Sequence, residues 1–269
     1  MKVGIIVLSW NSKKFIDVCL NGLLKHESSP VYVVDNGSVD SSPDHIKNNF
    51  PQVILICSPV NLGFASGNNL GIQKALQDGC DAIFLLNNDT IIDEKFIQSC
   101  LNVLKSNPSI GIVGPIIVEG NNPDIIQCRG GKISLWNLGF PYIGRGEKYE
   151  RQDYFKPVDF VLGAAMLIRR EVIEKTGGLD PEYYPAYVEE ADLCYRARLL
   201  GYKTVIYYGT RIRHLGKMSS GSHDDYIRLL TSNRFLFGLK HLDSLRFLLA
   251  GQIIVWKVFL KKIVKKYFK

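Results

Sequence analysis

The sequence predicts an α/β fold built on a doubly wound, mostly parallel sheet. Two observations support this prediction. Short apolar runs alternate with amphipathic helical segments through the N-terminal third of the chain, and each apolar run ends abruptly in polar residues. The central run, residues 83–86, is continuously apolar, which is typical of a strand buried on both faces of a parallel sheet. Strands that alternate with helices in this way pair in parallel through right-handed crossovers.

The N-terminal half is expected to contribute the regular part of the sheet. We expect strands at residues 3–8, 31–34, 53–57 and 83–86. After the first strand, apolar residues at spacings of three and four predict a helix from residue 15 to 24, and Ser12 is placed to cap it. A short helix is expected at residues 42–49. A turn rich in Gly and Asn, residues 61–69, opens another helix that runs to about Gln77.

The second half is less regular. Strands are expected at residues 110–118, 164–168, 203–208 and 211–214, and a helix at 171–176 should end at Gly177. Residues 189–200 predict an amphipathic helix with Leu193, Ala197 and Leu200 facing inward. Residues 121–156 are expected to form an insertion of loops, with one hairpin around 132–138.

Composition and charge exclude several classes of protein. Apolar residues make up 46% and charged residues 22% of the chain, as in ordinary globular proteins. The formal net charge of +7 lies in residues 240–269, so the remainder is neutral, unlike a nucleic-acid-binding body. The six cysteines form no C-x-x-C pair, which predicts buried thiols and no zinc site. The first apolar run is too short for a signal peptide, so we expect a cytoplasmic protein.

Polar residues follow three of the expected strands: Ser9-Trp10-Asn11, Asp35-Asn36 and Asn87-Asn88-Asp89. In open α/β sheets the ligand crevice lies beyond the carboxyl ends of the strands, so the three clusters predict a nucleotide pocket. A carboxylate there can hold a hard cation, which in turn holds a pyrophosphate. The alternative for residues 87–90 is a solvated turn, with Asp93 capping the next helix. The Gly-rich turn matches neither a Walker loop nor G-x-G-x-x-G, which disfavours ATPases and dinucleotide enzymes.

These motifs resemble the family 2 glycosyltransferases with the GT-A fold, and among them the rhamnosyltransferase-like group of bacterial polysaccharide enzymes. The matching stretches span residues 3–219 and occur in the order found in that family. They are VLSWNS, VVDNGSVD, NLGFASGNNLGI, FLLNNDT, LGAAMLIRR, GGLDPEYY, EEADLCYRA and RHLGKMS.

The resemblance implies an inverting transfer of a sugar from a nucleotide diphosphate donor to an acceptor hydroxyl. It places Ser9, Asn11, Asp35, Asn36, Asn68, Asn87 and Asn88 around the nucleotide, Asp89 and His214 on a Mg²⁺ or Mn²⁺ ion, and Glu189 and Glu190 at the catalytic Glu-Asp motif. Asn87 replaces the first Asp of the family's D-x-D motif, which implies weaker metal binding. Glu190 stands where Asp is usual and is longer by one methylene. The expected donor is dTDP-rhamnose or a UDP-hexose, and the acceptor a glycan or lipid-linked glycan.

Three acidic residues gather at the start of the helix expected at 189–200. We expect Glu190 to be the catalytic base, with Asp192 as the fallback. The alternative is that Glu189, Glu190 and Asp192 only decorate a helix N-terminus, where negative charge is favourable. Asp180 is expected either to contact the acceptor or to serve ordinary turn chemistry. His214 is expected either to bind metal or phosphate or to bond only to backbone.

The domain organisation expected is a catalytic domain, residues 1–240, followed by a basic tail, residues 241–269. The nucleotide-binding half would be residues 1–118 and the acceptor half residues 119–240. Apolar and lysine residues in the tail alternate at helical spacing, which predicts a helix lying on an anionic membrane surface. The alternative is a helix that packs on the catalytic domain. For the whole chain, the alternatives to a transferase are a nucleotide-binding protein without transfer activity and a nucleotidyltransferase on a similar fold.

Overall fold

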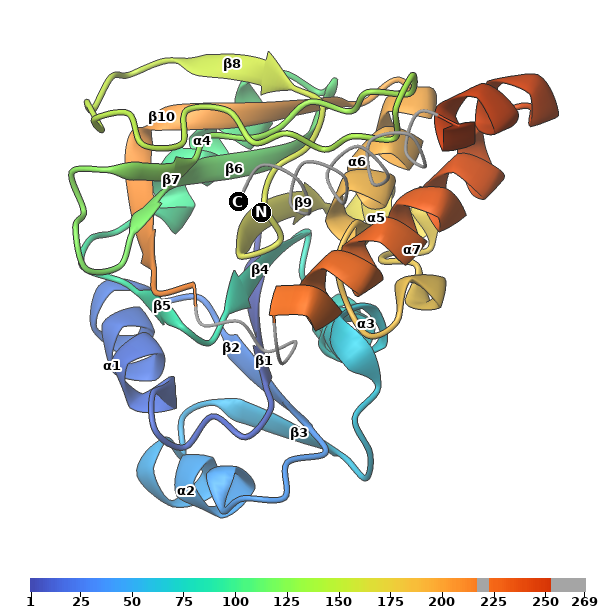
Figure 1. The fold of residues 1–269 in the computed structure, drawn as a ribbon. Helices are drawn as coiled ribbons and strands as arrows, with labels where there is room; N and C mark the ends of the chain where they lie inside the picture. The colour runs from blue at the N-terminus through green and yellow to red at the C-terminus, as the bar shows by residue number, and fades with distance from the viewer. Residues whose placement is uncertain (217–222, 253–269) are drawn as a thin grey trace, which may run out of the picture.

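The computed structural model describes residues 1–216 and 223–252, and Figure 1 shows their arrangement. The end of the RHLGKMS motif and the tail from residue 253 lie outside the described residues. The strands are β1 Val3–Ser9, β2 Val31–Asn36, β3 Ile54–Ser58, β4 Ala82–Asn87, β5 Thr90–Ile91, β6 Ile110–Glu119, β7 Ile126–Cys128, β8 Phe155–Val158, β9 Ala165–Arg169 and β10 Lys203–His214. The helices are α1 Ile16–His26, α2 Ser42–Asn49, α3 Gly63–Gln77, α4 Ile97–Ser106, α5 Arg170–Thr176, the 3₁₀ turn Pro181–Tyr183, α6 Glu189–Leu199 and α7 His223–His241.

One sheet runs through the molecule in the order β3-β2-β1-β4-β9-β6-β10-β5, with β7 on β6 and β8 on β10. The first four strands, β3, β2, β1 and β4, pair in parallel, which confirms the N-terminal prediction. Beyond β4 the sheet is mixed, because β9 inserts antiparallel between β4 and β6. The long segment between β7 and β9 gives the chain room to reverse direction before it re-enters the sheet.

The two faces of the sheet carry separate apolar cores, as expected of a doubly wound fold. Alternate residues of each central strand point to opposite faces. Phe84 and Leu86 of β4 pack with α1, α2 and α4, whereas Ile83 and Leu85 pack with α3, α5 and α6. β4 is therefore covered on both sides, which is why its sequence is continuously apolar.

Several local predictions were wrong in detail. Ser12 does not cap α1 with its side chain, because its hydroxyl is 2.6 Å from that of Ser9. Asp93 does not cap α4, whose first amides donate instead to the carboxylate of Glu27. Leu200 is exposed just past the end of α6. The two strands expected near the end are one strand, β10, with an irregularity between Tyr207 and Arg211.

Two further predictions concern the hairpin in the insertion and the state of the cysteines. A hairpin is present around the expected residues 132–138, held by antiparallel bridges between Ser134 and Gly139 and between Gly131 and Tyr142. All six cysteines are free thiols and five are buried, while Cys57 is exposed. The reduced state and the burial of most cysteines agree with the prediction.

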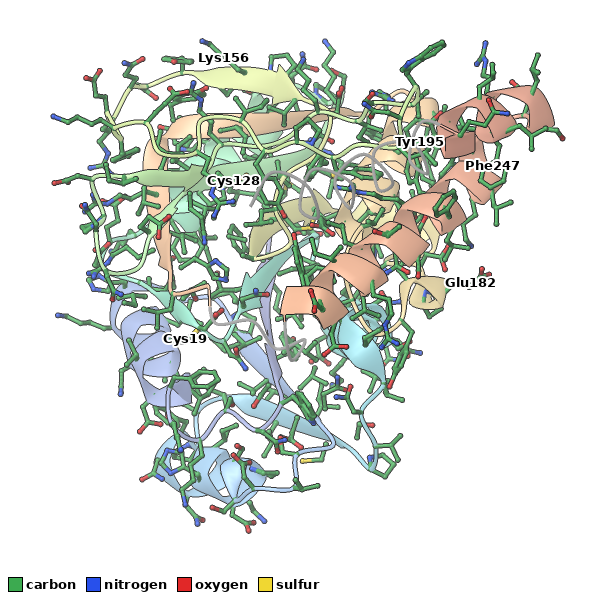
Figure 2. All side chains as sticks on the ribbon, in the orientation of Figure 1. Cys19, Cys128, Lys156, Glu182, Tyr195 and Phe247 are labelled. Carbon is green, nitrogen blue, oxygen red and sulfur yellow. The ribbon has the colours of Figure 1, made fainter. Side chains whose placement is uncertain are left out.

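The C-terminal helix α7 packs across α6 and passes through the expected domain boundary at residue 240 (Figure 1). Tyr195 of α6 stands against Phe237 of α7, with ring centroids 5.2 Å apart, and Figure 2 labels Tyr195 at this contact. The amide of Asn233 donates to the carbonyls of Ala186 and Tyr187. Within the described residues no helix combines the length and apolar character needed to cross a membrane.

Candidate active site

The polar residues that follow β1 and β2 hold one another in place. The carboxylate of Asp35 accepts hydrogen bonds from the backbone and the hydroxyl of Ser38, at 3.1 and 2.6 Å. Asn11 has a positive φ of 49°, and its carbonyl oxygen accepts from the amide of Val39 at 2.9 Å. Ser9 is fully buried beneath this loop. The three predicted residues therefore lie at adjacent strand ends, β1 beside β2, with Asp35 and Ser9 paired in register.

Two of the predicted asparagines have structural partners. Asn36 donates to Asn61 and to the carbonyl of Gly63, and it accepts from the amide of Leu62, so it fixes the start of α3. Asn68 is buried and donates to the carbonyl of Phe64 one turn earlier in the same helix. Both residues lie at the expected edge of the sheet and shape its backbone, so their contact with a nucleotide stays a prediction.

The end of β4 meets the end of β10. Nε2 of His214 lies 3.1 Å from Oδ1 of Asp89 and 3.4 Å from the amide nitrogen of Asn87. β5 creates this proximity, because Thr90 pairs directly with His214 across the antiparallel β5–β10 ladder. The side chains of Asp89 and His214 are both largely buried, while Asn88 is half-buried beside them. Two residues separated by more than 120 positions in sequence thus lie side by side, and their role as metal ligands stays a prediction.

Gln127 of β7 orients the His214 ring. Its side-chain oxygen lies 2.8 Å from Nδ1 of His214. Because a carbonyl oxygen only accepts, Nδ1 donates in that contact, and Nε2 is the ring nitrogen that faces Asp89. Metal-bound histidines are commonly fixed in this way by a hydrogen bond at the second ring nitrogen. Sequence reasoning missed Gln127, since nothing in the insertion distinguishes it.

The Asp89–His214 pair fits a divalent cation that also binds phosphate. One carboxylate oxygen and one imidazole nitrogen converge within hydrogen-bond distance, which is a donor set suited to Mn²⁺ and tolerated by Mg²⁺. No cluster of three or more His, Cys, Asp or Glu side chains occurs in the part of the chain that the structure describes.

Glu189 and Glu190 begin α6 just after a strained stretch of backbone. Tyr187 and Val188 have φ values of 83° and 80°, in the left-handed region that costs energy for β-branched or bulky residues. One carboxylate oxygen of each glutamate is buried and has no hydrogen-bond partner among the described residues. Burial raises the pKa of Glu190 to about 7 and raises that of Glu189 well above its usual range, with the charge of Glu190 adding to the shift.

Glu190 lies beside the carboxyl end of β4. The amide of Asn87 donates to the carbonyl of Ala164 at 3.0 Å. The residue before Ala164 is Gly163, where a Cβ would come within 3.5 Å of the Cβ of Glu190. These two contacts, between Asn87 and Ala164 and between Gly163 and Glu190, place the predicted base next to the strand end that bears Asp89.

Asp192 is fully buried and is held by three donors. Arg196 donates from Nε at 2.6 Å, Tyr183 from its hydroxyl at 3.1 Å, and Nε2 of His241 lies 2.6 Å away. Hydrogen bonds from His241 and the charge of Arg196 outweigh burial and lower the pKa of Asp192. The three donors and its full burial leave Asp192 little access to a substrate hydroxyl. The fallback role of Asp192 as base has therefore no geometric support.

Asp180 and Arg196 have structural partners as well. Asp180 accepts from the amide of Glu182 at 3.0 Å and pairs with Lys240 of α7 at 2.8 Å. Arg196 donates to the carbonyls of Thr176 and Gly178 in addition to Asp192. Of the two options for Asp180, the structure provides the contacts for turn chemistry, and contact with the acceptor stays a prediction.

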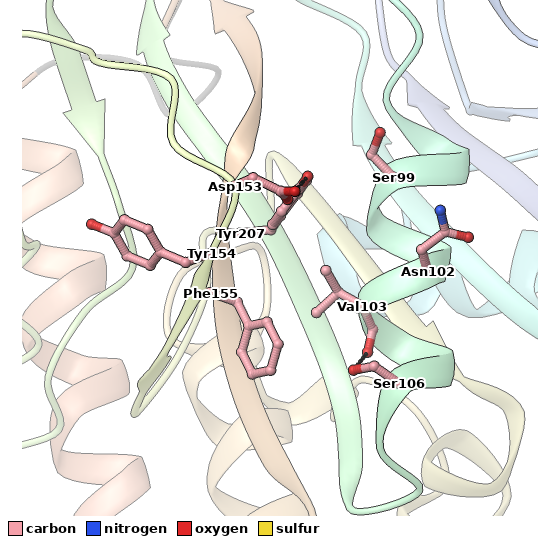
Figure 3. A pocket seen from close by; sticks show the side chains of 8 residues that line it. All are labelled: Ser99, Asn102, Val103, Ser106, Asp153, Tyr154, Phe155 and Tyr207. Carbon is pink, nitrogen blue, oxygen red and sulfur yellow. Dashed lines mark hydrogen bonds between the residues drawn. The ribbon is translucent and has the colours of Figure 1, made fainter.

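A surface hollow of about 560 Å³ is lined by residues other than these (Figure 3). It lies between α4 and the segment that leads into β8, with Tyr207 of β10 at its floor. Its lining residues are Ser99, Asn102, Val103, Ser106, Asp153, Tyr154, Phe155 and Tyr207. None of the predicted site residues lines it, so it is separate from the candidate active site.

The model of the family described as "Glycosyl transferase family 2" matches residues 4–177. The matched range contains β1 through α5, and with it the strand ends that carry Asp35 and Asp89. The chain belongs to glycosyl transferase family 2. The fold and the family expected from the sequence are therefore confirmed.

Curated relatives of this family 2 member include two named rhamnosyltransferases. An N-acetylglucosaminyl-diphospho-decaprenol L-rhamnosyltransferase of Mycobacterium tuberculosis is 25% identical over 71% of this chain and 68% of its own length. The dTDP-rhamnosyl transferase RfbF of Shigella flexneri is 27% identical over 62% of this chain and 53% of its own length. The chain thus spans about half to two thirds of these relatives.

Solved structures with the same fold include two glycosyltransferases. GalNAc-T7, determined with UDP, GalNAc and Mn²⁺, superimposes with a TM-score of 0.67 over 86% of this chain and 48% of its own, at 14% identity. Staphylococcus aureus TarS 1–349 in complex with UDP gives a TM-score of 0.60 over 94% of this chain and 71% of its own, at 14% identity. At these identities the likeness establishes the fold.

Proposed function

We propose that this family 2 glycosyltransferase moves a sugar from a nucleotide diphosphate donor to a hydroxyl of a lipid-linked glycan precursor. The observation that carries the proposal is the carboxylate of Glu190, which is buried beside the end of β4 with one oxygen unpartnered. The names of the rhamnosyltransferase relatives support dTDP-rhamnose as donor and a prenyl diphosphate-linked sugar as acceptor. The proposed acceptor is thus a sugar that already carries a diphosphate and a lipid.

Glu190 acts as the general base in this proposal. With a pKa of about 7, the carboxylate is ionised for part of the time near neutral pH and can accept the proton of an acceptor hydroxyl. The acceptor oxygen then forms a bond to the anomeric carbon while the bond from that carbon to the diphosphate oxygen breaks. Attack from the face opposite the leaving group inverts the anomeric configuration. The proton stays on Glu190 until product release.

Asp89 and His214 hold the leaving diphosphate in this proposal. A divalent cation bound between them would neutralise charge that develops on the diphosphate oxygens. We propose that Ser9, Asn11, Asp35, Asn36, Asn68, Asn87 and Asn88 form the nucleotide side of the pocket, since all lie at or beside the ends of β1, β2 and β4 or at the start of α3.

We expect Asp89→Ala to abolish cation-dependent binding of nucleoside diphosphate. Calorimetry with and without EDTA tests this, and wild-type affinity that ignores EDTA would contradict the role of the cation.

The experiment that tests the function measures products. The protein is incubated with dTDP-rhamnose or a UDP-hexose, Mn²⁺, and a short-chain prenyl diphosphate that carries N-acetylglucosamine. We expect release of nucleoside diphosphate together with a glycosylated product. Release of nucleoside monophosphate would indicate nucleotidyl transfer instead. Binding without turnover for any of these donors would support a nucleotide-binding protein.

Attachment to a membrane surface is part of the proposal. The last thirty residues carry the net charge of +7, and Leu245, Leu248 and Leu249 are exposed in residues 244–252, which the structure describes as helical after α7. Each lysine near an anionic surface contributes about 1 kcal/mol, screened by salt. We expect the full-length protein to sediment with anionic liposomes at low salt and a chain truncated after Asp243 to stay in solution. Equal sedimentation of the two would contradict the role of the tail.

A further inference from the structure

Arg234 of α7 is a half-buried cation that has no anionic partner among the residues that the structure describes. Its Nε is buried, and the side chain makes no hydrogen bond or ion pair with any residue that the structure describes. The other arginine of α7, Arg228, is largely exposed and lies 3.6 Å from Asp225. The two arginines therefore differ on one helix: Arg228 is solvated and paired, while Arg234 is neither fully solvated nor paired.

The environment of Arg234 favours the binding of an anion. Burial lowers the pKa of its guanidinium, which reports that the charged form is poorly solvated. A charge that has already lost part of its water gains more from an incoming anion than an exposed charge does. A guanidinium also presents its donors in a planar fork that matches phosphate oxygens, so phosphate is the chemical group that fits best.

Tyr142 links Arg234 to the catalytic carboxylates. The guanidinium interacts electrostatically with the hydroxyls of Tyr142 and Tyr226. Tyr142 in turn interacts with Glu190 and Glu189. Tyr142 as a whole residue is 41% exposed, and desolvation raises the pKa of its hydroxyl well above its usual range, with the charge of Glu190 adding to the shift. Asn233, the residue before Arg234, donates to the carbonyls of Ala186 and Tyr187, so Arg234 lies close to the start of α6 that bears Glu190.

The position of Arg234 points to the acceptor rather than to the donor. Asp89 and His214 lie where β5 meets β10, at the left of Figure 1, whereas α7 and α6 lie together at the right. Tyr142 belongs to the insertion, residues 121–156, and pairs with Gly131 there. A diphosphate attached to the sugar that presents its hydroxyl to Glu190 would lie beyond that sugar, on the side of Tyr142 and Arg234.

We propose that Arg234 binds a phosphate group of the acceptor and so selects acceptors that are diphosphate esters. The inference rests on the proposed function, because it assigns the acceptor side of the same site. Arg234 is a binding residue in this proposal and takes no part in proton transfer. The exposed Arg228 provides a matched control on the same helix.

The test is a direct binding measurement that needs no turnover. Geranyl diphosphate is titrated by calorimetry into the full-length protein saturated with UDP or dTDP and Mn²⁺, so that the donor position is already filled. We expect Arg234→Gln to weaken binding of geranyl diphosphate by about 10- to 100-fold, the loss typical of a hydrogen bond to a charged group. Arg228→Gln should bind as the wild type does. Arg234→Lys should lie between, because it keeps the charge and loses the fork.

A second arm distinguishes the two sources of phosphate. Affinity for the nucleoside diphosphate itself is measured in the same variants, and we expect no change in Arg234→Gln. A loss of nucleoside diphosphate affinity would assign Arg234 to the donor and overturn the proposal, as would equal binding of geranyl diphosphate by the wild type and Arg234→Gln. Thermal melting confirms folding, and Arg234→Lys carries the test if Arg234→Gln is unfolded. Binding that depends on Arg234 in a protein without transfer activity would retain this site and reject only the proposed function.

Discussion

On two sides of the start of α6, neighbouring buried carboxylates have pKa values that are shifted in opposite directions. On one side, Glu189 and Glu190 each keep a buried oxygen without a partner, and the pKa of Glu190 is raised to about 7. On the other side, two residues later, Asp192 is equally buried but accepts from Tyr183 and Arg196 and contacts His241, and its pKa is lowered. Burial is common to both sides. The difference lies in the donors that surround each carboxylate.

This comparison separates a carboxylate available for chemistry from one that serves the fold. An unpartnered carboxylate in a buried site exists in both protonation states near neutral pH and can exchange a proton. A carboxylate that accepts from several donors stays ionised, and its loss leaves buried donors unsatisfied. Within one helical turn, the raised pKa of Glu190 therefore indicates a group suited to proton transfer, and the lowered pKa of Asp192 indicates a group that stabilises the fold. Four predictions test it, in order of decreasing effect.

Glu190→Gln is expected to have the largest effect. Glutamine keeps the shape of the side chain but cannot accept a proton, so transfer should fall by about 10²- to 10⁴-fold with donor affinity nearly unchanged. Steady-state kinetics and donor calorimetry measure the two quantities. Glu189→Gln is the matched control and should lose less activity. Near-normal turnover in Glu190→Gln would remove this residue from the mechanism.

Asp192→Asn is expected to act on stability instead. Removing the charge leaves Arg196 buried against a neutral group, and breaking a buried pair in this way costs about 3 to 5 kcal/mol of unfolding free energy. Denaturant unfolding measures the loss. Asp180→Asn, at a partly exposed carboxylate paired with Lys240, should lose less. A variant of normal stability that has lost turnover would instead make Asp192 the base.

The pH dependence of activity and stability should separate the two sides. If Glu190 is the base, kcat/KM rises with pH up to about 7 and then levels off. Its raised pKa stabilises the fold fully below the usual value of 4.5, and that contribution is lost as pH rises through about 7. The lowered pKa of Asp192 works in the opposite sense, since its contribution is present above 3.8 and is lost as pH falls below that value.

Unfolding free energies of the wild type and Glu190→Gln across pH 4 to 8 measure this difference. Glu190→Gln should gain stability relative to the wild type as pH rises toward 7, because only the wild type then buries a charge at residue 190. A constant difference across that range would show that Glu190 has an ordinary pKa.

Gln127→Leu should have the smallest effect, because Gln127 acts on the site of Asp89 only through His214. Asp89 has His214 as a neighbour, and Gln127 fixes the ring of His214. Loss of that hydrogen bond should weaken Mn²⁺-dependent binding of nucleoside diphosphate by about 10- to 100-fold. Gln127→Glu should retain the acceptor for Nδ1 and bind more tightly than Gln127→Leu. Equal affinity in all three proteins would exclude Gln127 from the cation site.

Much of the fold followed from sequence because its signals are local. The apolar run of β4, the helix α2 and the Gly177 end of α5 each depend on a few adjacent residues, and each was predicted to within one or two positions. The predictions that failed concern contacts between distant segments. Glu27, and not Asp93, caps α4 from 69 positions away, and no local pattern indicates such a partner. The antiparallel pairing of β9 was not predicted for the same reason, because pairing direction depends on the path of the long insertion.

For the candidate site, the sequence by itself determined the residue types and the strand ends that carry them. Asp35, Asp89 and Glu190 were identified because acidic and amide residues that follow buried strands or open a helix stand out locally. Tertiary structure alone decided which of these carboxylates acquired partners. His241 reaches Asp192 from α7 and Gln127 reaches His214 from β7, across separations that sequence patterns do not encode. Burial and hydrogen bonding set a pKa through the three-dimensional surroundings of a group, so the distinction between Glu190 and Asp192 arises only on folding.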